Sequence, residues 1–153
     1  MTINDEFALG ALAGLVAMIP QVIFDFISVQ LNYSKHYAFQ ISSSIYLYEP
    51  LTQRPLGLIF GGLLWAIMSI ILGVITVYLL RSSGKDFWWL KGLAISNFFM
   101  FVIIYGFLYT LGAATIIPFD IPTNITIFIG NIIFGITVSY LITSWGGEKL
   151  PAT

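Results

Sequence analysis

Four long apolar runs, separated by polar breaks, constrain this chain more than any other feature of its sequence. Each run is longer than the roughly 20 residues that an α-helix needs to cross the hydrocarbon core of a bilayer. Charged residues are rare in them: the first contains Asp25, the third contains Lys91, and the second and fourth contain none. We therefore predict a polytopic membrane protein with spans at residues 7–31, 56–80, 87–111 and 121–145.

The composition indicates that lipid is the solvent of this chain. Hydrophobic residues make up 58% of the 153 and charged residues 8%, with a mean hydropathy of +0.93, whereas soluble domains carry about 25% charged residues. In hydrocarbon the backbone polar groups must bond within the element, which leaves helices and closed barrels. Because the apolar runs do not alternate with polar residues, helices are favoured. The sequence predicts one domain over residues 1–153, an all-α bundle of four transmembrane helices.

Several functional classes lack the residues that they need. There are no cysteines, and the one histidine, His36, lies outside the apolar runs, so disulfides, iron–sulfur ligation and paired-histidine haem ligation are excluded. A net charge of -1 without a basic stripe argues against nucleic acid as a partner. Phosphate-binding loop, zinc-protease and nucleophile-elbow motifs are missing. We expect no enzyme activity, no cofactor and no bound metal.

The first run is expected to be a retained helix rather than a cleaved signal sequence, because no basic segment precedes it and no clear cleavage site follows. Asp5 and Glu6 stand where carboxylates favour the start of a helix. Pro20 falls near the middle of the run. It predicts a kink rather than a break, because neighbouring helices or water can satisfy the carbonyl that proline frees.

One long connection, residues 32–55, joins the first two spans. It is too short and too polar for a fifth span. Its tyrosines and serines are typical of a short interfacial or re-entrant element at headgroup depth. A loop packed over the mouth of the bundle is the alternative. The tight turn at 81–86, by contrast, predicts that spans two and three are antiparallel neighbours.

Four spans place both termini and the turn at 81–86 on one side of the membrane. That side carries four basic residues and the other side carries two: Arg81, Lys85, Lys91 and Lys149 against Lys35 and Arg54. The positive-inside rule therefore favours termini in the cytoplasm. The margin is small, so dual topology in an antiparallel dimer stays open.

Asp25 is the candidate functional residue, because a carboxylate at membrane depth costs about 2.5 kcal/mol or more and faces a cavity or a partner. Gln21, Asp25 and Ser28 recur at helical spacings, so the polar side of this helix should face protein. Arg54 or Lys35 is the expected charge partner. With such a partner Asp25 has a structural role; without one, it becomes a candidate for a transported proton or cation.

Asn97 in the third span and Asn131 in the fourth are the other intramembrane amides of interest. An amide in hydrocarbon seeks a partner, and these two are able to bond across the bundle for about 1 kcal/mol. Helix packing is the first interpretation, and a polar path is the alternative. Pairs of small residues spaced by four also favour close helix contacts, within the chain or between copies: Gly10 and Gly14, Gly57 and Gly61, and Gly92 and Ser96.

The chain also resembles a family, on the following segments: Ala11–Ala17, Trp89–Leu93, Leu111-Gly112, Pro118–Pro122, and Phe128–Asn131 with Gly135. Together they are similar to the YagU-like bacterial inner-membrane proteins, over about two thirds of the chain. The resemblance implies a small multi-pass protein of the bacterial inner membrane. That family often carries Gly-His where this chain has Gly130-Asn131, so no metal or proton role is carried over to Asn131.

Three functions are compatible with these sequence features. In the first, the chain is a small transporter or channel, a homo-oligomer with a dimer as first choice, in which Asp25, Gln21, Asn97 and Asn131 line a polar path. In the second, it is a non-catalytic scaffold or accessory subunit that presents residues 32–55 to a membrane-protein partner. In the third, it is a membrane enzyme that acts on lipid, with Asp25 and His36 or Glu49 meeting at the outer interface. No sequence motif supports this third function.

Overall fold

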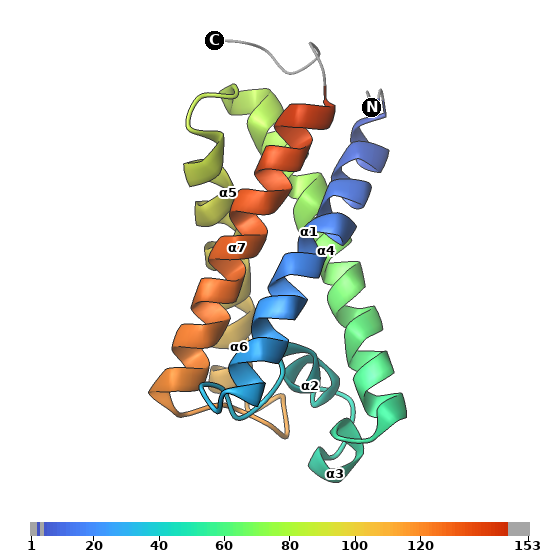
Figure 1. The fold of residues 1–153 in the computed structure, drawn as a ribbon, viewed down its shortest axis with the longest axis vertical. Coiled ribbons are helices and arrows are strands. Elements are labelled where there is room, and N and C mark those ends of the chain that lie inside the picture. The colour runs from blue at the N-terminus through green and yellow to red at the C-terminus, as the bar shows by residue number, and fades with distance from the viewer. Residues whose placement is uncertain (1–2, 4, 147–153) are drawn as a thin grey trace.

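The computed structural model describes Ile3 and residues 5–146, without the side chains of residues 101, 108 and 109. Within this part of the chain, four helical stretches are long and apolar enough to cross a membrane, which confirms the predicted all-α bundle (Figure 1). The helices in chain order are α1 (Glu6–Gln30), α2 (Ala38–Ser43), α3 (Glu49–Thr52), α4 (Pro55–Ser83), α5 (Trp88–Asn97), the π-helix η1 (Phe98–Ile104), α6 (Tyr105–Leu111) and α7 (Ile121–Trp145).

The predicted spans match these helices closely, and the third one is composite. Helix α7 covers the predicted residues 121–145, while α1 and α4 differ from prediction by one to three residues at their ends. In the third span the chain changes from α-helix to π-helix and back, through α5, η1 and α6. The sequence did not reveal this change, because an apolar run looks the same in either winding. π-helical turns inside α-helices are often found at functional sites.

Side-chain caps fix where two of the spanning helices begin. The carboxylate of Asp5 accepts a hydrogen bond of 2.6 Å from the backbone N–H of Ala8, and Asp120 accepts one of 3.1 Å from Thr123. Both satisfy N–H groups that the first turn of a helix leaves without a partner. Pro20 lies inside α1 without ending it.

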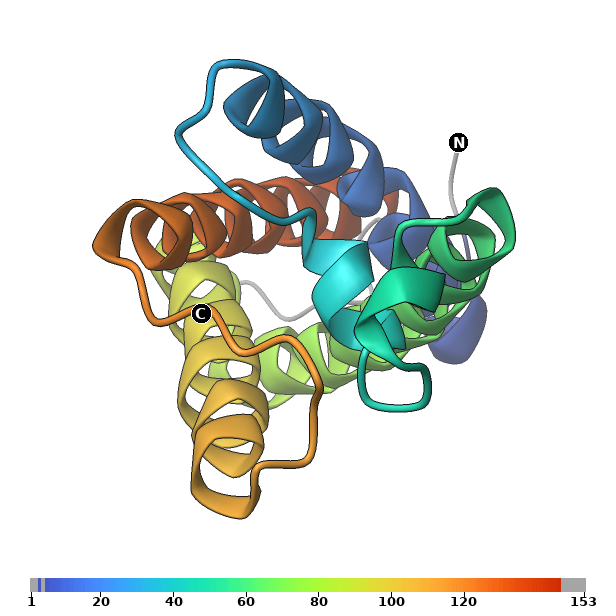
Figure 2. The ribbon, with the colours of Figure 1, turned by 90° about the horizontal axis from the view of Figure 1, so that it is seen from below.

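The spanning helices follow the order α4, α1, α7, α5 around the bundle. Helix α1 packs along both α4 and α7, and α5 packs along α7. Helices α4 and α5 contact each other much less, although residues 84–87 join them directly. Spans two and three are thus antiparallel neighbours, as predicted, but each packs mainly against another helix. A short connection brings two helix ends together, but it does not prevent the helices from diverging, as Figure 2 shows from below.

Glycines allow the closest of these helix contacts, and the predicted small-residue pairs act within the chain. A Cβ on Gly14 would overlap the carbonyl of Ser69 in α4, and one on Gly92 would overlap Ser139 in α7. A Cβ on Gly61 would likewise overlap the carbonyl of Phe39 in α2. Backbones can approach this closely only where no side chain intervenes.

The two ends of the bundle differ in structure. The N-terminus of α1, the C-terminus of α7 and the turn between α4 and α5 lie at one end, and α2 and α3 lie at the other (Figure 1). Lys149, which contributed to the predicted orientation, lies outside the described residues. At the second end α2 sits in the mouth of the bundle (Figure 2), with Ile41 and Ser43 almost fully buried. The predicted short element between the first two spans is thus a buried helix.

Candidate functional site

Asp25 lies inside the protein and holds the start of α2. Its side chain is 5% exposed, and Oδ2 accepts a hydrogen bond of 2.9 Å from the backbone N–H of Ala38, the first residue of α2. At the same helix start, Tyr37 N–H donates to the side chain of Gln40 at 2.9 Å. The buried carboxylate therefore satisfies a helix-terminal N–H that would otherwise lack a partner away from water.

The expected charge partners of Asp25 are placed elsewhere. Lys35 Nζ lies 3.8 Å from Asp120 Oδ2, and Arg54 is exposed at the start of α4. No ion pair of Asp25 occurs among the residues that the structure describes. The prediction of an Asp25 pair with Lys35 or Arg54 was wrong, because the backbone of a neighbouring short helix supplies the hydrogen-bond donor instead.

Gln21 and Asn131 belong to a chain of hydrogen bonds that joins all four spans. Gln21 in α1 donates through Nε2 to Asn131 Oδ1 in α7 at 3.2 Å, and its Oε1 accepts from the indole N–H of Trp65 in α4 at 3.4 Å. Ser96 in α5 donates to the backbone carbonyl of Asn131 at 2.9 Å. Each bond joins two different helices, so this chain, Trp65–Gln21–Asn131–Ser96, links the bundle across its interior.

Asn97 takes no part in that chain. Its Nδ2 donates to the carbonyl of Leu93, one turn earlier in its own helix, at 3.1 Å. The predicted bond between Asn97 and Asn131 was wrong, because Gln21 from α1 takes the amide oxygen of Asn131 and Ser96 bonds its carbonyl. Sequence reasoning missed Trp65, since a tryptophan within an apolar run is indistinguishable from one that faces lipid.

Among the described residues, two buried amide atoms near the middle of the bundle have no hydrogen-bond partner. They are Asn131 Nδ2 and Asn97 Oδ1. Asn131 and Gln21 also line a cavity of about 10 Å³, which is close to the volume that one water molecule needs. A single water bonded to Asn131 Nδ2 would satisfy this donor.

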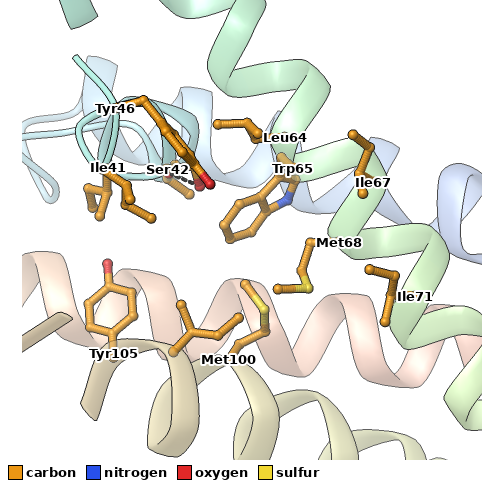
Figure 3. A pocket seen from close by; sticks show the side chains of 13 residues that line it. Ile41, Ser42, Tyr46, Leu64, Trp65, Ile67, Met68, Ile71, Met100 and Tyr105 are labelled. Carbon is orange, nitrogen blue, oxygen red and sulfur yellow. Dashed lines mark hydrogen bonds between the residues drawn. The ribbon is translucent and has the colours of Figure 1, made fainter. Parts of the chain in front are cut away.

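A larger hollow lies between α4 and the third span, beneath α2. Its volume is about 220 Å³, and side chains from α2, α4, η1, the start of α6 and the segment after α2 line it. Trp65, Met68 and Met100 form its inner wall, and Tyr46, Ser42 and Tyr105 lie toward the end that holds α2 (Figure 3). The hollow exists because α4 and α5 diverge and because η1 faces the gap. None of these features is visible in the sequence.

A small set of polar contacts, called the latch below, joins the segment before α2 to the start of α7. It consists of Lys35, Thr123 and Asp120. The backbone N–H of Lys35 donates to Thr123 Oγ1 at 3.1 Å, and Thr123 Oγ1 donates to Asp120 Oδ1 at 2.7 Å. The hydrogen bonds from Thr123 lower the pKa of the Asp120 carboxyl below its usual value, and the charge of Lys35 acts in the same direction. The latch helps to keep the segment that carries α2 over the bundle.

The described residues contain no group of three or more histidine, cysteine or acidic side chains able to hold a metal ion. Asp25 is buried while Glu49 is exposed, and no hydrogen bond among the described residues joins Asp25 to His36 or Glu49. Comparison of the chain with protein-family models, curated proteins and solved structures finds no significant match.

Proposed function

We propose that this chain is a non-enzymatic multi-pass membrane protein that acts as a scaffold or accessory subunit, in which the buried polar side chains fix the fold. The observation that carries the proposal is the hydrogen bond from Ala38 to Asp25. The carboxylate that would be the first candidate to bind a transported cation is already engaged in holding α2. Gln21, its neighbour one turn earlier, is bonded to both α4 and α7.

The interior between this polar region and the end with the termini is mainly apolar. Buried side chains from three spanning helices pack there, among them Leu9, Ala13, Ala17, Leu72, Val77 and Val138. The buried hydroxyls of Thr76 and Ser139 bond to carbonyls of their own helices, at 2.7 and 2.9 Å. An ion would have to leave its polar partners to cross this layer, at a cost of several kcal/mol.

A partner would meet the chain at the end that holds α2 and α3. Aromatic side chains are strongly exposed there: Tyr48 is 78% exposed and Phe119 is 81% exposed. Aromatic residues of this kind suit the headgroup region and are also enriched where proteins associate. In this proposal the polar chain and the latch keep that end rigid, so that it presents a constant surface to a second membrane protein.

The test is ion and proton flux in liposomes that contain the purified protein. If the protein is a scaffold, liposomes with the wild type or with Asp25→Asn should show the same flux as empty liposomes. Flux above that level in the wild type, lost in Asp25→Asn, would refute it. A folded state confirmed by helix content and by a single elution peak is the control for each preparation.

Transport is the second candidate, favoured by the unpaired Nδ2 of Asn131 beside a cavity large enough for one water. A homo-oligomer, with a dimer as first choice, would then supply the rest of a path, because four helices are few to enclose one. The same flux measurement decides between the two functions. Asn131→Leu should reduce flux if this amide lines a path, and it should leave the baseline unchanged if the protein is a scaffold.

The proposed location is the bacterial inner membrane with both termini in the cytoplasm. It is supported by the excess of basic residues at the turn between α4 and α5 and by the resemblance to YagU-like proteins. Reporter domains fused to each terminus test this orientation. A reporter that folds only in the cytoplasm should be active at both termini. Activity of a reporter that folds only in the periplasm, at either terminus, would oppose this orientation, and activity of both kinds of reporter would indicate dual topology.

A further inference from the structure

The hollow between α4 and η1 opens toward the membrane side of the bundle. The side chains on its rim are exposed, with Ile67 at 56% and Ile71 at 46%. Its inner wall is buried, with Trp65 at 7% and Met100 at 4%. A hollow with such a rim is in contact with acyl chains wherever the bundle is embedded, because α4 and the third span both cross the bilayer.

The lining of this hollow matches a hydrocarbon chain in size and chemistry. Apolar side chains dominate it, and its volume of about 220 Å³ exceeds the 150 Å³ or so of an engineered apolar cavity that stays dry and binds benzene. It is smaller than pockets that enclose whole drug-sized ligands, which begin near roughly 300 Å³. Part of one acyl chain fits these dimensions, and methionines such as Met68 and Met100 adapt to a flexible ligand.

A second, shallower hollow adjoins the first at the end that holds α3. Tyr46 lines both, and Arg54 lines the second together with Leu56 and Phe60. Arg54 is exposed, and the ion pairs found among the described residues do not include it. Glu49 does not line either hollow. A guanidinium in this position is placed to bind a phosphate with two parallel hydrogen bonds.

We propose that these two hollows form one site for an anionic phospholipid of the bilayer, with an acyl chain against Trp65 and Met100 and the headgroup phosphate at Arg54. The order of the groups matches the order in a lipid: Arg54 lines the hollow at the end of the bundle, Tyr46 lines both hollows, and Trp65 and Met100 line the apolar one. Figure 3 shows the positions of Tyr46, Trp65 and Met100. The charge of Arg54 selects an anionic headgroup over a zwitterionic one. This site is independent of the scaffold proposal and requires no transport.

Trp65 provides a direct reporter of the site. The other tryptophans, Trp88, Trp89 and Trp145, begin α5 or end α7 at the opposite end of the bundle, and replacing them with phenylalanine leaves Trp65 as the fluorophore. The probes are phosphatidylglycerol and phosphatidylcholine whose acyl chains carry bromine, which quenches tryptophan on contact. We expect phosphatidylglycerol to give the same quenching at a mole fraction about fivefold lower than that of phosphatidylcholine. This factor corresponds to about 1 kcal/mol for one basic residue at an anionic surface.

Matched variants separate the headgroup contact from the chain contact. Arg54→Gln should abolish the fivefold preference, and Arg54→Lys should retain most of it, whereas Lys35→Gln removes a charge that is paired with Asp120 and should change nothing. Ser42→Phe places a ring in the cleft and should reduce quenching by both lipids. Leu63→Phe adds the same ring to α4 outside the cleft and serves as its control.

Equal quenching by the two lipids, or an unchanged preference in Arg54→Gln, would overturn the proposal. A second copy of the chain seated in the cleft would also overturn it, and an Ile67→Cys variant tests this, since the chain has no other cysteine and quantitative disulfide dimers would form. Native mass spectrometry of the unmodified protein is the second measurement. It should retain phosphatidylglycerol in preference to phosphatidylcholine, and equal retention would count against the site even if the triple tryptophan variant did not fold.

Discussion

The carboxylate of Asp25 accepts a hydrogen bond from the backbone N–H of Ala38 at 2.9 Å, and both residues are buried. This bond connects a membrane-spanning helix to the short helix that fills the mouth of the bundle. In the proposed scaffold function the carboxylate has a structural role, since it accepts a hydrogen bond from the first N–H of α2.

Asp25→Leu should destabilise the protein by about 1–3 kcal/mol, because the buried N–H of Ala38 loses its acceptor. Asp25→Asn should lose less, since an amide oxygen in the same place can still accept this bond. Unfolding by denaturant in mixed micelles measures both. Equal losses in the two variants would indicate that the charge, rather than the hydrogen bond, is what the fold needs.

Gln21 and Asn131 should be energetically coupled. A double-mutant cycle with Gln21→Met and Asn131→Leu should give a coupling of about 1 kcal/mol, as for other hydrogen bonds between membrane helices. The free energy of unfolding of the two single variants and the double variant is the measurement. Asn97→Leu is the control, because Asn97 bonds within its own helix and should add to Gln21→Met without coupling.

Gly14→Ala should destabilise the bundle by about 1–3 kcal/mol, because the new methyl group would overlap the carbonyl of Ser69 and push α1 away from α4. Gly62→Ala provides a matched control on α4, since a Cβ there meets nothing within 4 Å. That control should be neutral or stabilising by up to about 1 kcal/mol, the difference in helix propensity. Thermal unfolding of both variants decides, and similar destabilisation by the two would argue against the close contact.

Stability should fall at acidic pH through the latch of Asp120. Its folded-state pKa lies below the usual value of 3.8, so the latch contributes fully above the unfolded-state pKa and is lost as the pH falls through the folded-state pKa. The contribution should be below about 1 kcal/mol, because the pair with Lys35 is largely solvated. Asp120→Asn keeps a good helix cap and should flatten the dependence of the free energy of unfolding on pH below about pH 5.

The spans and the direction in which Asp25 points were predictable from the sequence. Apolar runs longer than the bilayer is thick fix the spanning helices, and the spacing of Gln21, Asp25 and Ser28 places them on one buried side of α1. Hydropathy and helical period can both be read from a single sequence.

The partners of these side chains were not predictable. Asp25 bonds a backbone N–H, and every residue except proline offers one, so no side-chain pattern marks it. Gln21 meets Trp65 and Asn131 because α1 packs between α4 and α7, an order that depends on contacts between helices far apart in sequence. The hollow between α4 and the third span depends on η1 and on the divergence of α4 from α5, which hydropathy does not encode.

The structural role of the intramembrane carboxylate is tested most directly by hydrogen exchange at the amide of Ala38, with the protein in lipid nanodiscs. The amide should exchange slowly in the wild type and in Asp25→Asn, and about tenfold or more faster in Asp25→Leu, the factor expected when a buried bond of this kind is lost. Exchange in Asp25→Leu as slow as in the wild type would contradict the account.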